Sequence, residues 1–178
     1  MQLSIHQEEK LWRLGDMAEL HVLLLRQAAQ DASMEDDRGG QARLYPSPVS
    51  FKEVLQEGEF LEDWKEYVTE ELHTQFASDV GVLLNDLEAL EAEETGGEAS
   101  YHLSVPIDHG SFWFSTLNQA RLLLDQKYVL HPNGGEFEAD ASPESLLEVD
   151  PAQRLSASMR YEFYAVIQVR WTPFFGQK

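Results

Sequence analysis

The sequence predicts a mostly α fold, a helical bundle of about four main helices with a minor N-terminal β element, in one domain of 178 residues. Two observations carry this prediction. Apolar residues recur every three or four positions over long stretches, which is the spacing of one helix face. Acidic segments at about 33–41, 91–100 and 136–150, the first two of which contain a glycine pair, separate these stretches, and we expect them to be flexible loops.

The N-terminal elements are expected to be a short hairpin and a first helix. Two brief alternations of apolar and polar residues, at Leu3–Ile5 and Leu11–Leu14, predict two paired strands. Asp16 is a residue type that caps helices, and the apolar residues that follow it predict a helix at about 17–31.

The clearest pattern lies in the middle of the chain. Apolar residues from Leu61 to Leu90 follow one another at intervals of three or four positions. They predict one helix of about 30 residues, or about 45 Å at 1.5 Å per residue. Gly81 lies within it, and the low helix propensity of glycine predicts a kink or a close helix crossing there.

Two further helices are expected in the second half of the chain. A short extended piece at 101–107 precedes the first, with Asp108 as its expected cap. The expected core face of this helix consists of Trp113, Leu117, Ala120, Leu124 and Tyr128. Asp150 and Pro151 form a helix-start pair, but 155–171 shows strand-like alternation as well as helical spacing. Helix is favoured because the cap is good and the run is long for a strand.

The chain is strongly acidic, with 13 Lys and Arg against 32 Asp and Glu and a net charge of −19. This charge repels phosphate backbones and anionic lipids, so neither nucleic acid nor a membrane is an expected partner. It favours solubility and basic partners. The absence of cysteine excludes disulfides, thiol catalysis and zinc–thiolate sites. Because no signal peptide and no membrane-spanning apolar run is visible, a cytoplasmic location is expected.

Candidate catalytic and metal-ligating residues are few. Glu70 and His73 have the Glu-x-x-His spacing of di-iron bundles, but those bundles need a second copy and two further glutamates. No second copy occurs, so we expect a surface pair without metal. No serine lies in a nucleophile elbow, and no glycine pattern matches a phosphate-binding loop. We therefore expect no catalytic residues and no cofactor.

One polar cluster is a candidate for a structural or a ligand-binding role. Asn118 and Arg121 lie three positions apart in a strongly apolar helix and so share a face. Asp79 and Asp86 lie on one face of the long helix, close to its apolar residues. Because a buried arginine needs a carboxylate, Arg121 is expected to pair with one of them and to fix the register of two helices. The alternative is that Arg121 binds an anionic ligand in a cleft.

Aromatic residues gather at 112–114 and 161–175. Three consecutive aromatic residues cannot all face inward from one helix. An exposed aromatic patch of the kind found at interfaces is one expectation, and coverage by loops is the other.

Three short segments carry a resemblance to a known family: Arg43–Pro46, Asp63–Val80 and Leu117–Leu122. In these segments the chain resembles the uncharacterised bacterial family called domain of unknown function 2017. The resemblance implies a helical, cytoplasmic protein that is often encoded near the ClpS adaptor of the Clp protease. It thus implies, at most, a link to regulated proteolysis. It implies no activity and no site residues.

The sequence therefore predicts a non-enzymatic interaction or adaptor protein with an unidentified protein partner, and it is compatible with a homo-oligomer. The first alternative is an enzyme or small-ligand binder with a cleft around Arg121 and the carboxylates of the long helix. A weaker alternative is mimicry of nucleic acid by the acidic surface.

Overall fold

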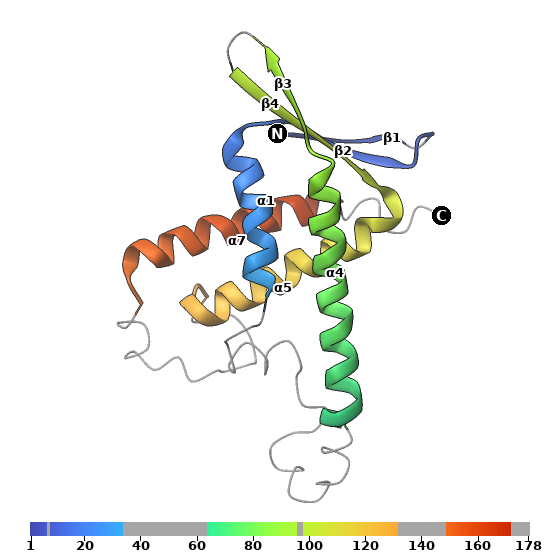
Figure 1. Ribbon diagram of the computed structural model, residues 1–178. Helices are drawn as coiled ribbons and strands as arrows, with labels where there is room; N and C mark the ends of the chain where they lie inside the picture. Colours follow the sequence, from blue (N-terminus) through green and yellow to red (C-terminus); the bar gives the residue numbers. More distant parts are fainter. Residues whose placement is uncertain (7, 34–63, 96–97, 132–148, 172–178) are drawn as a thin grey trace, which may run out of the picture.

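The computed structural model describes residues 1–6, 8–33, 64–95, 98–131 and 149–171, and in these the protein has an α+β fold (Figure 1). A four-stranded antiparallel sheet lies at one end of four main helices. The prediction of a mostly α bundle with a minor N-terminal β element is therefore wrong. Strand β3 and the first residues of β4 come from the middle of the chain, where the sequence suggested a flexible loop.

The sheet begins with the expected N-terminal hairpin. Its strands are β1 (Gln2–His6), β2 (Leu11–Met17), β3 (Glu91–Thr95) and β4 (Glu98–Pro106). Strand β1 pairs with β2, and β4 lies between β2 and β3. The hairpin and the extended piece before the third helix are thus confirmed.

The acidic segment at 91–100 forms β3 and the start of β4, so its prediction as a flexible loop is wrong. Thr95 pairs with Glu98, which leaves only a Gly-Gly pair between the two strands. A two-residue glycine connection is a hairpin signal. Glu91 and Glu93 are exposed on the edge strand. Charged residues are common on such strands because they oppose pairing with other chains. Of the remaining predicted loops, 33–41 and 136–150, all but residues 33, 149 and 150 lie outside the described residues.

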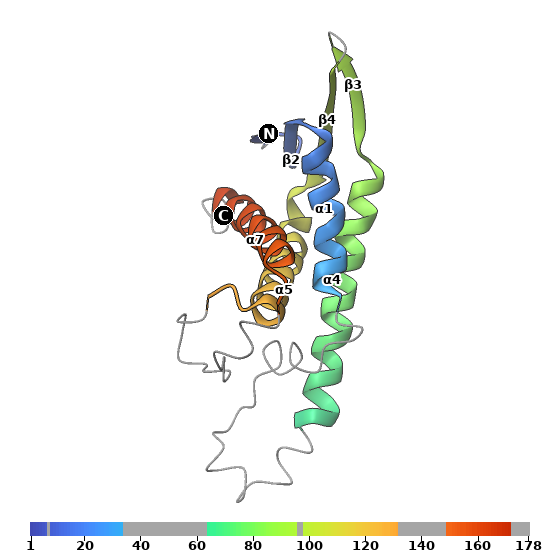
Figure 2. The same ribbon diagram turned by 90° about the vertical axis from the view of Figure 1, so that its left-hand side faces the viewer.

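The helices are arranged in two pairs of different direction. The elements are α1 (Glu19–Ala32), η1 (Trp64–Thr69), α4 (Glu70–Glu88), η2 (Ile107–His109), α5 (Gly110–Tyr128) and α7 (Pro151–Trp171). The π-helical η1 continues directly into α4, which confirms a long helix in the middle of the chain. In Figure 1, α1 leads away from the sheet and α4 leads back toward it, while α5 and α7 cross them. Figure 2 shows α7 at one side of the molecule and α4 at the other.

Of the three predicted helix caps, the structure confirms one. Asp16 belongs to β2 with a positive φ of 50° at an irregularity in the pairing, where Asp is tolerated. The cap of α1 is instead Ala18, whose N–H donates to His21 Nδ1 at 3.0 Å. Asp108 is exposed in η2, and α5 has no side-chain cap. The cap predicted at Asp150 is confirmed, since its Oδ1 accepts a hydrogen bond from the backbone N–H of Ala152, in the first turn of α7, at 3.3 Å.

The core joins the inner face of the sheet to α5 and α7. Trp171, at the end of α7, is fully buried between Trp12 of β2 and Trp113 of α5, with ring centroids 5.2 and 5.3 Å away. The predicted core face of α5 is buried except for Tyr128, which is half-buried. Because α7 is helical throughout, the choice of helix over strand for 155–171 is confirmed.

Gly81 lies on the exposed side of α4, and no heavy atom lies within 4 Å of where a Cβ would be. The predicted close helix crossing is therefore wrong. Gly81→Ala should raise the free energy of unfolding by roughly 0.5–1 kcal/mol, because alanine has the higher helix propensity and restricts the unfolded chain. Urea denaturation would show a higher midpoint at an unchanged slope. Ala77→Gly, also exposed on α4, is the reciprocal control and should lower the midpoint. An unchanged midpoint in both variants would contradict this.

Candidate functional site

Arg121 connects α5 to α7. Its Nη1 donates to Gln168 Oε1 at 2.7 Å, and its Nη2 donates to the Tyr161 hydroxyl at 2.9 Å. The guanidinium also lies over the Tyr161 ring, 4.5 Å from its centroid. Gln168 is held in turn by a hydrogen bond from its Nε2 to the Phe114 carbonyl. These contacts link α5 to α7 through neutral acceptors, whereas the prediction paired Arg121 with a carboxylate of the long helix.

The carboxylates predicted to receive Arg121 have other donors. Asp86 is buried, and its Oδ2 accepts Trp113 Nε1–H at 2.8 Å. The ring nitrogen His109 Nδ1 lies 3.0 Å from both Asp86 oxygens. Asp79, seven positions earlier on α4, is also buried. Its Oδ1 accepts a hydrogen bond from Gln75 Nε2 at 2.7 Å. Arg121 and the two carboxylates thus do not form one cluster among the described contacts.

The Asp86–His109 pair resembles half of a catalytic arrangement. A carboxylate that binds Nδ1–H orients an imidazole and leaves Nε2 available as a base. The His109 side chain is 30% exposed. In the described part of the chain, however, no hydrogen bond connects His109 to a serine or threonine that could serve as a nucleophile. The pair therefore ties the start of α5 to α4.

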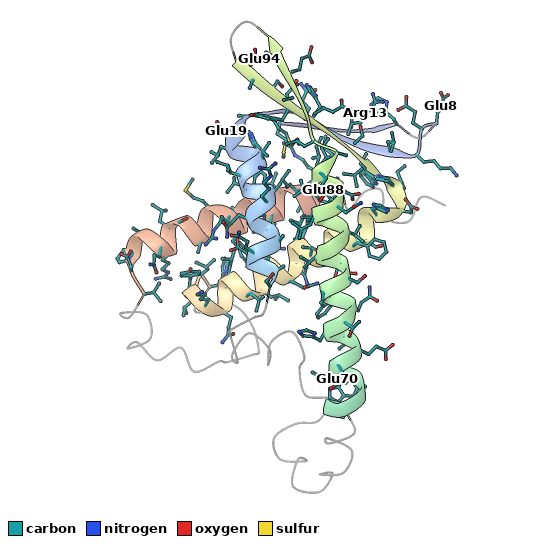
Figure 3. The ribbon with its side chains drawn as sticks, in the orientation of Figure 1. Glu8, Arg13, Glu19, Glu70, Glu88 and Glu94 are labelled. Atoms are coloured by element: carbon teal, nitrogen blue, oxygen red, sulfur yellow. The ribbon has the colours of Figure 1, made fainter. Side chains whose placement is uncertain are left out.

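The remaining sequence candidates lie on the surface. Asn118 is exposed on α5. Glu70 and His73 are exposed at the start of α4, at the end far from the sheet, where Figure 3 labels Glu70. Among the described residues, no group of three or more His, Asp and Glu side chains is placed to hold a metal ion.

A buried ion pair between α1 and α7 was not predicted from the sequence. The carboxylate of Asp31 accepts hydrogen bonds from Arg160 Nη1 at 2.7 Å and from the Tyr164 hydroxyl at 2.8 Å. Gln27, one turn earlier, donates at 3.3 Å. Burial raises the pKa of Asp31 above its ordinary value, against the lowering effects of Tyr164 and Arg160. Only the Gln27–Asp31 spacing could have been noticed, because the other partners lie more than a hundred positions away.

Asp31 gives the protein a specific pH dependence. Because its pKa is raised in the folded state, the folded protein holds this proton more tightly than the unfolded chain does. Its contribution to the free energy of unfolding therefore falls as pH rises above the ordinary value of 3.8 and through the raised pKa. Urea unfolding of wild type and Asp31→Asn between about pH 4 and about pH 7 should show the wild type losing stability relative to the variant. A relative gain with rising pH would contradict the raised pKa.

A groove of about 550 Å³ runs between α1 and α4. Its apolar lining includes Ala29, Val80 and Leu84, while Arg26 and Glu88 contribute charges of opposite sign. None of the candidate site residues named from the sequence lines it.

The outward face of α7 is apolar. Leu155, Met159, Val166 and Val169 are 64%, 61%, 43% and 69% exposed. Glu162, also exposed, lies between them on the same face. We call these five residues the α7 stripe. The opposite side of the helix packs into the core, so α7 has apolar residues on both faces. Helical spacing alone did not reveal which of these apolar residues would remain exposed.

Comparisons with known proteins give no relative. No protein-family model matches the chain, no curated protein matches it, and no solved structure matches it. The resemblance to the family of unknown function therefore stays a prediction. In the described part of the chain, no helix has the length and apolar character needed to cross a membrane.

Proposed function

We propose that this protein is a non-enzymatic interaction module that binds another protein through the α7 stripe. The observation that supports this is the exposure of four large apolar side chains along one helix face. Large apolar side chains exposed along one face of a highly charged protein are characteristic of binding sites. The net charge of −19 already favours solubility, and an exposed apolar face opposes it. Such a face therefore suggests a role in binding.

The geometry gives less support to an enzyme or small-ligand site at Arg121. Its guanidinium is occupied by Gln168 and Tyr161, and it stacks on the tyrosine ring. The two carboxylates expected beside it accept hydrogen bonds from other residues: Asp79 from Gln75 of α4, and Asp86 from Trp113 of α5. A cytoplasmic location and a link to regulated proteolysis stay predictions of this proposal.

Site-specific photo-crosslinking in the cells that produce the protein would test this function. A benzophenone amino acid at Met159 should give one adduct of defined mass, because the stripe is covered when the partner is bound. The same group at Ser104, which is exposed on the sheet, is the control and should give none. An absence of adducts at Met159 and at Val169, or equal labelling at Ser104, would contradict the proposal.

A further inference from the structure

We infer that the partner of the α7 stripe is an amphipathic α-helix of a different protein, with a lysine or arginine opposite Glu162. This inference rests on the proposed function and adds the chemistry of the partner. It follows from the spacing of the stripe, from its length and from the position of its one charge.

The spacing identifies the partner element as a helix. The stripe residues, at 155, 159, 162, 166 and 169, are separated by four, three, four and three positions. This is the a/d repeat by which one helix packs against another in a coiled coil. Ala157, Tyr164 and Trp171 lie at the f positions of the same repeat and are buried in the core. The buried face therefore holds the backbone of α7 in place while the α7 stripe faces outward.

The dimensions define the partner further. From Leu155 to Val169 the α7 stripe is about 21 Å long at 1.5 Å per residue, which corresponds to about four helical turns. Ser158 and Ala165 flank it on one side, and their short side chains permit close approach of another helix. A partner helix of about three heptads would cover the stripe completely.

Glu162 determines the charge of the partner. It is the single acidic residue of α7, and among the described side chains it forms no ion pair. Two basic residues of the helix are directed elsewhere, since Arg160 binds Asp31 and Arg154 donates to the Val129 carbonyl. Covering Glu162 with apolar groups would remove its hydration without compensation, which is costly. A cation at the facing position offsets that cost.

A second copy of the chain does not meet this requirement. In a parallel pair, Glu162 would face its own counterpart. In an antiparallel pair it would face Met159, Val166 or its counterpart, and each arrangement leaves the carboxylate without a cation. The net charge of −19 adds general repulsion between copies and favours a basic partner.

Two synthetic peptides would test this inference on the full-length protein. Both are helix-forming and about three heptads long with Leu at a and d, and they differ only in Lys or Glu at the central d position. Fluorescence anisotropy should show that the wild type binds the Lys peptide about tenfold or more tightly than the Glu peptide. Glu162→Lys should reverse this preference, and Met159→Asp should abolish binding of both. Circular dichroism would verify that the exposed substitutions leave the fold unchanged.

The outcomes separate this inference from the proposed function. Equal affinity for both peptides, or no binding of either by the folded wild type, would overturn the helical, cationic partner. Adducts at Met159 in cells would in that case still support an interaction module. Sedimentation that shows a wild-type dimer, abolished by Met159→Asp, would assign the stripe to a second copy and overturn the inference.

Discussion

Trp171→Ala should lower the free energy of unfolding by about 3–5 kcal/mol, as expected for removal of a large aromatic side chain from a packed core. Trp171 is fully buried and contacts Trp12 and Trp113, so it joins the sheet, α5 and α7. Its removal leaves a cavity where these three elements meet. Urea denaturation followed by far-ultraviolet circular dichroism would measure the loss.

Two control variants test whether the loss comes from removal of the buried ring. Trp171→Phe should cost much less than alanine, because most of the ring contact remains. In addition, Trp171 Nε1 has no hydrogen-bond partner among the described residues, so no hydrogen bond is lost. Leu155→Ala removes an exposed side chain from the same helix and should change stability by no more than about 0.5 kcal/mol. If Trp171→Ala cost no more than Leu155→Ala, the tryptophan cluster would not be the junction of the fold.

The features that follow from local sequence were predictable. The spacing of Trp113, Leu117, Ala120 and Leu124 defines the buried face of α5, because helix geometry alone places them together. The start of α7 likewise follows from Asp150 and Pro151, since the cap is formed within one turn. Such features need no knowledge of the neighbouring elements.

The features that depend on distant segments were not predictable. Strand β3 is acidic and exposed, so its composition does not indicate a strand. It is a strand because it pairs with β4. Helical spacing placed Arg121 near the inner side of α5 but could not indicate which helix it would meet. Its acceptors lie on α7, 40 and 47 positions away in the chain. The spacing of the α7 stripe was likewise visible in the sequence, but its exposure depends on where α1 and α5 pack.

Asp31→Ala should lower the free energy of unfolding by about 3–5 kcal/mol, the cost of breaking a buried ion pair by removing one partner. The side chains of Asp31 and Arg160 are 8% and 15% exposed, so the guanidinium would remain buried without its carboxylate. Tyr164 would lose one acceptor but could keep its contact with the Leu24 carbonyl at 3.3 Å. Chemical denaturation at neutral pH would measure the loss.

A double variant distinguishes the loss of a useful attraction from the cost of an unpaired charge. Asp31→Leu combined with Arg160→Met should recover most of the stability lost in Asp31→Ala, because apolar groups of similar size can replace a buried pair with little net cost. Glu9→Ala breaks the exposed pair with Arg13 and should change stability by less than about 1 kcal/mol. If the double variant were as unstable as Asp31→Ala, the attraction between the two charges would itself stabilise the packing of α1 on α7. Recovery would instead show that the pair defines how these helices meet and contributes little to net stability.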